Sequence, residues 1–282
     1  MVTMKKHYLN FQRFSLALSV GLAMSTSIPA GASIQNTTLS QGVPTGSGSL
    51  LALEGSRLGF KVRGIRPSQK REGGLVRKGS NSNSCAGKEM SVTALLPKTN
   101  EAELLEKAQI EVESTVSPRP TFLVHITQPP VKNAEFIVQK QNGEIIADKK
   151  IALTGNAGVL SMTLPADVKP LEVGQLYHWS FSVICDPGDS GENMVVDGWV
   201  KRIEPDPTLA AQLKNASERD RVAFYAQAEI WTDALSTLAE LRKEKPNDKQ
   251  VEGDWKSLLE SVNLNTVVSA TIIGSVNGTT GQ

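Results

Sequence analysis

The segment 182–194, SVICDPGDSGENM, holds the residues with the clearest chemical potential in this chain. The letters Gly188-Asp189-Ser190-Gly191 also surround the nucleophile of many serine proteases, so one hypothesis is acyl transfer at Ser190. The acidic side chains and glycines suit a second hypothesis, a calcium loop, because hard cations prefer oxygen ligands. The third hypothesis is a turn between two strands that a disulfide at Cys185 fixes.

Catalysis at Ser190 would need a histidine base and an orienting carboxylate upstream, in the order His, Asp, Ser. After residue 32 the chain offers His125 and His178, and neither has the small-residue, cysteine-adjacent surroundings of the protease histidine. The protease motif also continues Gly-Gly-Pro after the serine, whereas this chain continues Gly191-Glu192-Asn193. Because no acid, base and nucleophile converge here, we expect no catalytic residues.

The calcium hypothesis rests on Asp186, Asp189 and Glu192. Their spacing differs from that of an EF-hand, which needs oxygens at alternate positions and a distal bidentate glutamate. Asp, Pro, Gly and Asn are also the usual turn formers, so a structural turn is favoured and calcium is a weak alternative. We expect no other metal and no cofactor, because the chain lacks a C-x-x-C pair, histidines at ligand spacing and a glycine-rich phosphate loop.

The first 32 residues have the three parts of a secretory signal peptide. Basic residues come first, a short apolar run follows over residues 14–24, and Ala30-Gly31-Ala32 forms an A-x-A cleavage site. The run is shorter than the ~20 residues that span a bilayer. We therefore expect export, cleavage near Ala32, and a mature chain without a transmembrane segment, in the periplasm or outside the cell.

An exported chain with two cysteines predicts one disulfide, between Cys85 and Cys185. The alternative is two free buried thiols. A disulfide here would close a long loop, and the loop-entropy argument gives it a stabilising effect of about 4–5 kcal/mol.

The charge of the chain is nearly balanced, with 30 basic and 29 acidic residues. Residues 1–32 contain basic but no acidic side chains, so the mature chain is slightly acidic, which argues against a dedicated nucleic-acid-binding protein. Residues 33–84 are rich in Gly, Ser, Asn and Gln, and they predict a disordered linker. The basic residues between Arg57 and Lys88 suggest an alternative, docking on an anionic envelope polymer or lipid headgroup.

Residues 85–204 alternate with the period of two that β-strands require. One face of the segment 175–185 is apolar: Tyr177, Trp179, Phe181, Val183 and Cys185. Asn142-Gly143 predicts a hairpin turn with positive φ at both positions. About seven such runs predict an antiparallel, immunoglobulin-like β-sandwich. A carbohydrate-stacking platform of Tyr177, Trp179 and Trp199 is less favoured than a core, since alternation turns Tyr177 and Trp179 inward.

Residues 205–264 change to the helical period. Asp206 before Pro207 predicts one helix start, Ser217 with Asp220 predicts a second, and Asp248 after Pro246 predicts a third. The stretch 217–245 has the length and spacing of a single tetratricopeptide-like helical hairpin. For the tail, residues 265–282, both a docked strand and a frayed end are compatible with the pattern.

Three strings, PLEVGQLYHWSFSVICDP (170–187), VDGWVKRIEP (196–205) and YAQAEIWTDALSTLAELRKEKPND (225–248), resemble the secreted cyanobacterial family catalogued as domain of unknown function 928. The resemblance covers about residues 85–262. It implies an exported cyanobacterial envelope protein but no activity, since none is assigned to the family. We expect a non-catalytic module that binds an envelope protein or polymer; the alternatives are an uncharacterised hydrolase and a calcium-stabilised structural module.

Overall fold

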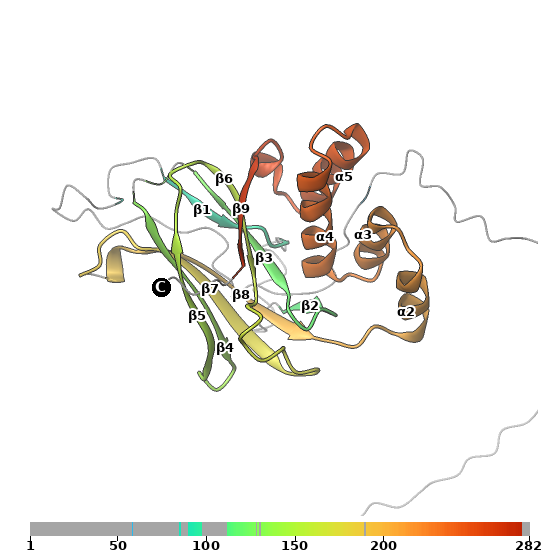
Figure 1. Ribbon diagram of the computed structural model, residues 1–282, viewed down its shortest axis with the longest axis horizontal. Coiled ribbons are helices and arrows are strands. Elements are labelled where there is room, and N and C mark those ends of the chain that lie inside the picture. Colours follow the sequence, from blue (N-terminus) through green and yellow to red (C-terminus); the bar gives the residue numbers. More distant parts are fainter. Residues whose placement is uncertain are drawn as a thin grey trace, which may run out of the picture. The chain divides into compact units, whose positions relative to one another are not determined.

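The computed structural model describes Leu58, Cys85 and residues 90–97, 112–127, 129, 131–188 and 190–277. The predicted signal peptide lies outside these residues, as does the predicted linker apart from Leu58, which is buried. In the described part, nine strands form two sheets, and four α-helices follow the eighth strand (Figure 1). The prediction of a β-rich part followed by C-terminal helices is confirmed.

The strands form a four-stranded sheet, in the order β1-β3-β6-β9, and a five-stranded sheet, in the order β2-β8-β7-β4-β5. The strand bounds are Val92–Ala94 (β1), Glu113–Thr115 (β2), Thr121–Ile126 (β3), Asn133–Lys140 (β4), Ile145–Ala152 (β5), Gly158–Thr163 (β6), Leu176–Val183 (β7), Met194–Arg202 (β8) and Ile272–Asn277 (β9). The inner faces of the two sheets form the core, where Phe122 contacts Trp179 and Phe136 at ring-centroid distances of 4.9 and 5.8 Å.

The prediction that the sandwich is antiparallel is wrong at two edges. β2 pairs with β8 in parallel, and β9 pairs with β6 in parallel. The other strand pairs in the described part are antiparallel. Side chains alternate between faces in both kinds of strand, so the sequence pattern does not distinguish the two directions.

The hairpin between β4 and β5 forms where Asn142-Gly143 predicts it. The Lys140 N–H donates to the Glu144 carbonyl at 2.8 Å, and Gly143 has a φ of 87°. Positive φ at Asn142 was also expected, and that expectation is wrong. The Asn142 side chain instead accepts a hydrogen bond from the Glu144 N–H at 3.1 Å, so this turn uses its side chain and needs glycine at one position.

Three of the four helices in the described part begin at a predicted capping residue. The helices are α2 (Pro207–Lys214), α3 (Glu218–Gln227), α4 (Trp231–Glu244) and α5 (Lys249–Glu260). The exception is α4, which follows Ile230 and has no side-chain cap. Asp206 accepts from the Thr208 and Leu209 N–H groups, and Ser217 and Asp248 cap the N-termini of α3 and α5 in the same manner. Across the described residues, we find no helix with the length and apolarity that membrane crossing demands.

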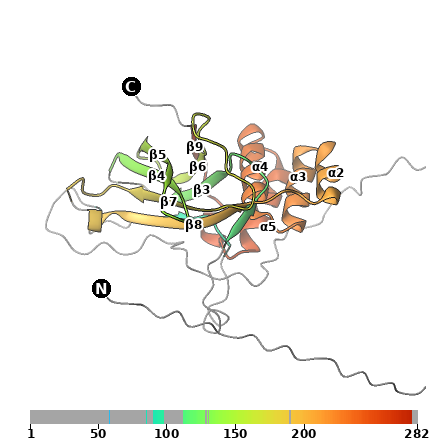
Figure 2. The ribbon, with the colours of Figure 1, turned by 90° about the horizontal axis from the view of Figure 1, so that it is seen from below.

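Hydrogen bonds at the start of α4 attach the helices to the sandwich, beside which they lie in Figures 1 and 2. The indole N–H of Trp231 donates to the Leu95 carbonyl at 2.8 Å, and the Val116 N–H donates to Asp233 Oδ2 at 3.2 Å. The side chains of Trp231 and Asp233 both lie in the first turn of α4. This turn therefore fixes the helices on the residues that follow β1 and β2.

The tail returns from α5 to the four-stranded sheet. Trp255 Nε1 donates to the Val268 carbonyl at 3.1 Å, and Arg242, whose guanidinium lies 5.0 Å from the Trp255 ring centroid, donates to the Ala270 carbonyl at 2.7 Å. β9 follows directly and pairs with β6. Of the two alternatives that the sequence left open for the tail, the docked strand is the one that residues 272–277 adopt.

Candidate functional site

The two cysteines form a disulfide in the structure. Their sulfur atoms lie 1.98 Å apart, their Cα atoms lie 5.3 Å apart, and each residue is 3% exposed. Cys185 follows the last inward-facing residue of β7, Val183, so the strand phase carries its side chain into the core. Asn193 Oδ1 accepts from the Cys185 N–H at 3.1 Å and closes the loop beyond the disulfide.

The loop after Cys185 has the features of a structural turn. Asp186 Oδ1 accepts a hydrogen bond from the Gly188 N–H at 2.7 Å, and residues 190–192 form a single 3₁₀ turn. Ser190 is exposed. His178, the nearest upstream histidine in sequence, has hydrogen-bond partners at both ring nitrogens, as described below. The structure therefore provides no support for Ser190 as an activated nucleophile.

The candidate calcium ligands are only partly described. Asp189 lies outside the described residues, and among those described no group of three or more His, Cys, Asp or Glu side chains could hold a metal ion. Glu192 Oε2 is buried, and it has no hydrogen-bond partner in the described part of the chain. The calcium loop at Asp186, Asp189 and Glu192 thus stays a prediction.

A second site lies on the outer face of the five-stranded sheet. Strand register places twelve side chains in three rows across β5, β4, β7 and β8, and we call them the outer-face strip. The rows are Lys150–Glu135–Ser182–Val195, Asp148–Ile137–Ser180–Asp197 and Ile145–Gln139–His178–Trp199. Every one of these residues is at least partly exposed, whereas the residues that alternate with them along β4, β7 and β8 are buried, apart from Lys140 at the end of β4.

The second and third rows share a fixed polar cluster, in which His178 and Gln139 of the third row meet Asp197 of the second. His178 Nε2 lies 2.7 Å from Asp197 Oδ2, and His178 Nδ1 lies 3.3 Å from Gln139 Nε2. If the glutamine amide donates to Nδ1, the ring is neutral and its Nε2–H donates to the carboxylate. The imidazole also packs against Trp199, with ring centroids 4.7 Å apart. The cluster therefore holds the indole of Trp199 in one position on a partly exposed face.

This geometry suits binding better than acid–base catalysis. A general base needs a free nitrogen lone pair that can reach a substrate proton, and here each ring nitrogen of His178 has a partner in the sheet. An indole beside ordered amide, imidazole and carboxylate groups offers instead a flat apolar surface with hydrogen-bonding groups at its edge.

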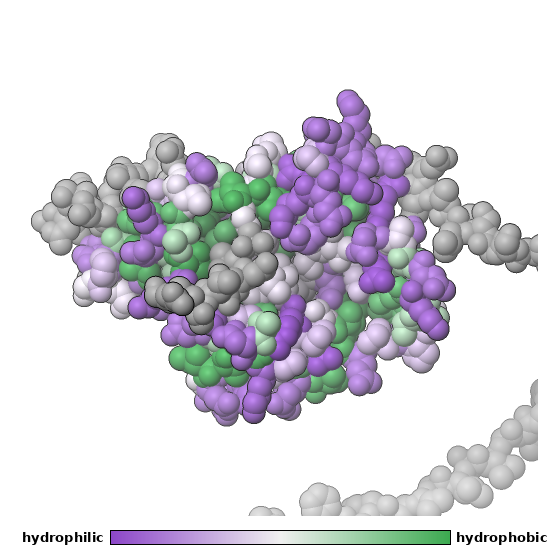
Figure 3. Space-filling model, viewed as in Figure 1, coloured by the Kyte–Doolittle hydropathy of each residue, from purple (hydrophilic) through white to green (hydrophobic). Residues whose placement is uncertain are grey.

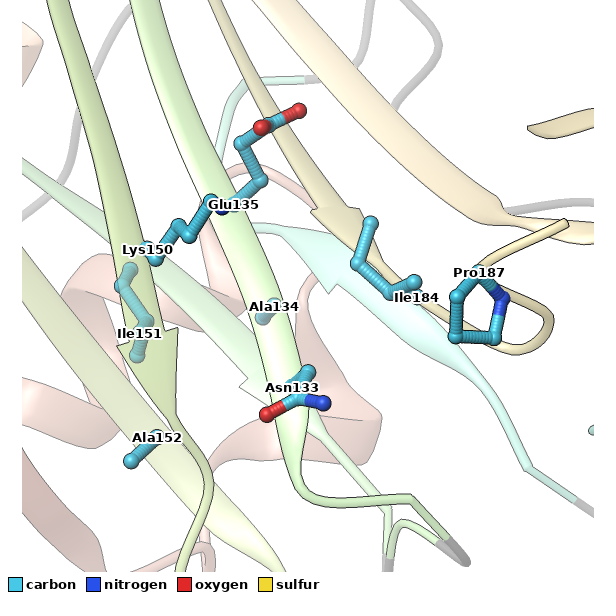
Figure 4. A pocket seen from close by; sticks show the side chains of 8 residues that line it. All are labelled: Asn133, Ala134, Glu135, Lys150, Ile151, Ala152, Ile184 and Pro187. Carbon is cyan, nitrogen blue, oxygen red and sulfur yellow. The ribbon is translucent and has the colours of Figure 1, made fainter.

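A pocket of about 420 Å³ lies at the other end of the strip, and Figure 4 shows it from close by. Its lining residues are Asn133, Ala134, Glu135, Lys150, Ile151, Ala152, Ile184 and Pro187. Lys150 extends from β5 toward β4, and Ile184 and Pro187 lie on the opposite side of β4 (Figure 4). Among the described residues neither Glu135 nor Lys150 forms an ion pair, so the pocket presents an acid, a base and an apolar wall.

Large apolar side chains are exposed at one end of the third row and in the loop before β7. Ile145, at the start of β5, is 54% exposed, and Val173, in the loop before β7, is 45% exposed. Figure 3 shows hydrophobic surface over the β4–β5 hairpin, with hydrophilic residues around it. The strip thus mixes apolar and polar groups along its whole length.

One further titratable group is buried at the junction of helices and sandwich. Burial raises the pKa of Asp233 to about 6, although hydrogen bonds from Thr115, Val116 and Ser117 oppose the rise. Burial also lowers the pKa of His125, on the four-stranded sheet. Asp233 is 6% exposed, so it contributes to the junction of the helices with β2 and not to the strip.

Part of the strip could be predicted from the sequence. The expectation that Tyr177 and Trp179 belong to the core is confirmed, since each is 1% exposed, and His178 lies on the polar face as predicted. Trp199 is separate from them on the outer face. Gln139 and Asp197 were missed, because their contacts with His178 join three strands and depend on a register that no single strand reveals.

The described part of the chain is therefore a two-sheet, β-rich protein with a C-terminal helical module and an ordered outer sheet face. A family model described as Domain of Unknown Function (DUF928) matches residues 72–272. Since this match covers most of the chain, the protein belongs to that family, which confirms the resemblance. A search of curated proteins found no match.

Proposed function

We propose that the protein is an exported, non-catalytic envelope module that binds another envelope component through the outer-face strip. One observation carries this proposal: His178, Asp197 and Gln139 hold Trp199 on a partly exposed sheet face, and their hydrogen bonds occupy both nitrogens of the imidazole. Partly exposed polar groups gain little stability from one another, so this cluster contributes little to folding. We therefore assign its order to binding.

The location is part of the same proposal. The pattern of residues 1–32 supports export with cleavage near Ala32, and the disulfide supports an oxidising compartment, the periplasm or the outside of a cyanobacterial cell. Mass spectrometry of the protein from its native host tests this. A first residue near 33 agrees with the proposal, and an intact Met1 contradicts it.

We further propose that the sandwich is immunoglobulin-like. Its support is the strand order, in which β1, β3 and β6 take the places of strands A, B and E, and β4, β7 and β8 those of C, F and G. The Tyr177 hydroxyl, at the start of β7, accepts from the upstream Glu172 N–H at 3.0 Å, as in a tyrosine corner. The parallel strand β9 and the position of the disulfide depart from that pattern.

The helical module is proposed to be tetratricopeptide-like at α3 and α4. Support comes from the packing of α3 on α4 and from the positions of Tyr225, Ala234 and Pro246. The ion pair of Arg219 with Asp254, at 2.5 and 3.1 Å, joins α3 to α5 and provides a third helix for the hairpin to pack against. A single hairpin forms no solenoid, so its packing on neighbouring elements is what stabilises it.

Affinity capture from an envelope extract tests the proposed function. The mature protein, Trp199→Ala and His178→Ala are compared with His125→Ala, a matched histidine substitution on a strand of the other sheet. The proposal expects a captured envelope component that the first two substitutions release and His125→Ala retains. Capture that no strip substitution changes would contradict it.

Two alternatives have specific observations in their favour. The His178–Asp197 contact resembles the orienting half of a hydrolytic triad, so activity profiling with polysaccharide and peptide substrates, and its loss on Asp197→Asn, would favour a hydrolase. The buried Glu192 oxygen favours calcium at the loop. A melting temperature that rises with calcium and loses this response in Glu192→Gln would favour a calcium-stabilised module.

A further inference from the structure

The chemistry of the outer-face strip identifies a class of ligand. Trp199 supplies a planar apolar ring, and Gln139, His178 and Asp197 place an amide, an imidazole and a carboxylate beside it. A pyranose ring has the complementary surfaces, since its C–H bonds form an apolar face and its hydroxyl groups point outward from the edge. Hydroxyls both donate and accept, so they suit a cluster that offers both donors and acceptors.

The charges of the strip argue for an uncharged ligand. Acids and bases are interspersed: Glu135 faces Lys150 across the first strand pair, and the Asp197 carboxylate is paired with His178. Such a mixture creates no extended field of one sign, so a polyanion or polycation gains little attraction along it.

The geometry argues for a chain and not a single sugar. The pocket at Glu135 and the row at Gln139 are four residues apart on β4, which corresponds to about 13 Å along a strand. A ligand that contacts both must therefore extend along β4 and β7. The pocket walls at Ile184 and Pro187 are apolar, so this end can also accept the apolar face of a ring.

We propose that the outer-face strip binds an uncharged polysaccharide lengthwise, with one sugar stacked on Trp199 and a later unit in the pocket of Glu135 and Lys150. This inference rests on the proposed function and specifies its ligand. Its distinctive consequence is a dependence of affinity on oligomer length, because only a sufficiently long chain contacts both ends of the strip.

Isothermal titration calorimetry with linear uncharged glucan and xylan oligomers tests the inference, using a dimer, a tetramer and a hexamer of each. For at least one series we expect the hexamer to bind about tenfold more tightly than the dimer. Trp199→Ala should weaken hexamer binding about tenfold, the amount that loss of one aromatic stack implies. Trp199→Phe keeps a ring in place, so it should bind with intermediate affinity and guards against a folding defect.

The pocket has its own variant. Glu135→Ala should lower the affinity for the hexamer but leave the affinity for the dimer unchanged. His125→Ala should change neither affinity. Polygalacturonate serves as the anionic probe. If polygalacturonate binds in a Trp199-dependent manner and the uncharged oligomers do not, the inference is wrong while the proposed function stands. If no oligomer binds but envelope capture still requires Trp199, the partner is a protein: the polysaccharide inference is wrong and the proposed function stands. If neither oligomer binding nor envelope capture depends on Trp199, the inference and the proposed function are both wrong.

Discussion

At the residue scale, Gly198 shows how a position without a side chain shapes the core. A Cβ at this position would lie 2.8 Å from Trp179 Nε1, closer than a real Cβ tolerates, and 3.0 Å from Leu96 Cδ1, which is a tight contact. We predict that Gly198→Ala lowers the free energy of unfolding by about 1–3 kcal/mol in urea denaturation, because the buried indole must move.

The matched control is Gly253→Ala in α5, where an added Cβ meets no atom within 4 Å. Alanine is the better helix former, so this substitution should raise the free energy of unfolding by about 0.5–1 kcal/mol. Equal effects of the two substitutions would mean that the indole of Trp179 does not occupy the space above Gly198.

Asp233 makes the stability of the protein depend on pH. Because its pKa rises from 3.8 to about 6 on folding, the folded protein keeps a proton between pH 4 and 6 that the unfolded chain releases. The contribution of this group to the free energy of unfolding therefore falls as the pH rises through that window, by about 3 kcal/mol at most. Above pH 6 the full cost of the buried charge is present.

Asp233→Asn should remove that slope. Its amide oxygen still accepts from the Val116 N–H, but it carries no charge to bury, so the stability of the variant relative to the wild type should increase between pH 4 and 7. Denaturant midpoints at several pH values measure the difference. Parallel curves for the two proteins would show that Asp233 keeps its ordinary pKa.

At the scale of elements, the sequence predicted what local patterns determine. The helix starts at Asp206, Ser217 and Asp248 follow from capping chemistry, and the inward face of β7 follows from alternation. The parallel pairing of β2 and β9 could not be predicted, since it depends on which distant strand each one reaches. The same reason hid the contacts of His178 with Asp197 and Gln139.

The attachment of β9 provides a prediction at this scale. Trp255→Phe removes the hydrogen bond to the Val268 carbonyl and weakens the contact with Arg242, while it keeps an aromatic ring in the core. We expect a loss of about 1–2 kcal/mol and faster amide exchange in residues 272–277, measured by hydrogen–deuterium exchange. In Trp231→Phe, which removes the bond to the Leu95 carbonyl, exchange of β9 should stay at its wild-type rate.

At the scale of the whole molecule, the disulfide connects residues 100 positions apart in the sequence. A loop of this length predicts a large entropic effect on the unfolded chain, so we expect the double variant Cys85→Ser, Cys185→Ser to lose about 2–5 kcal/mol. Reduction of the wild type in denaturant should shift its midpoint to the same value. A double variant as stable as the oxidised protein would assign the stability to packing alone.

In the proposed function, the outer face of the five-stranded sheet is the surface that meets the partner. Hydroxyl-radical footprinting of the mature protein, with and without envelope extract, measures this directly. We expect the extract to lower the oxidation of Trp199 and to leave the oxidation of His125, on the other sheet, unchanged. Equal oxidation of Trp199 in the presence and absence of the extract, together with protection elsewhere, would contradict it.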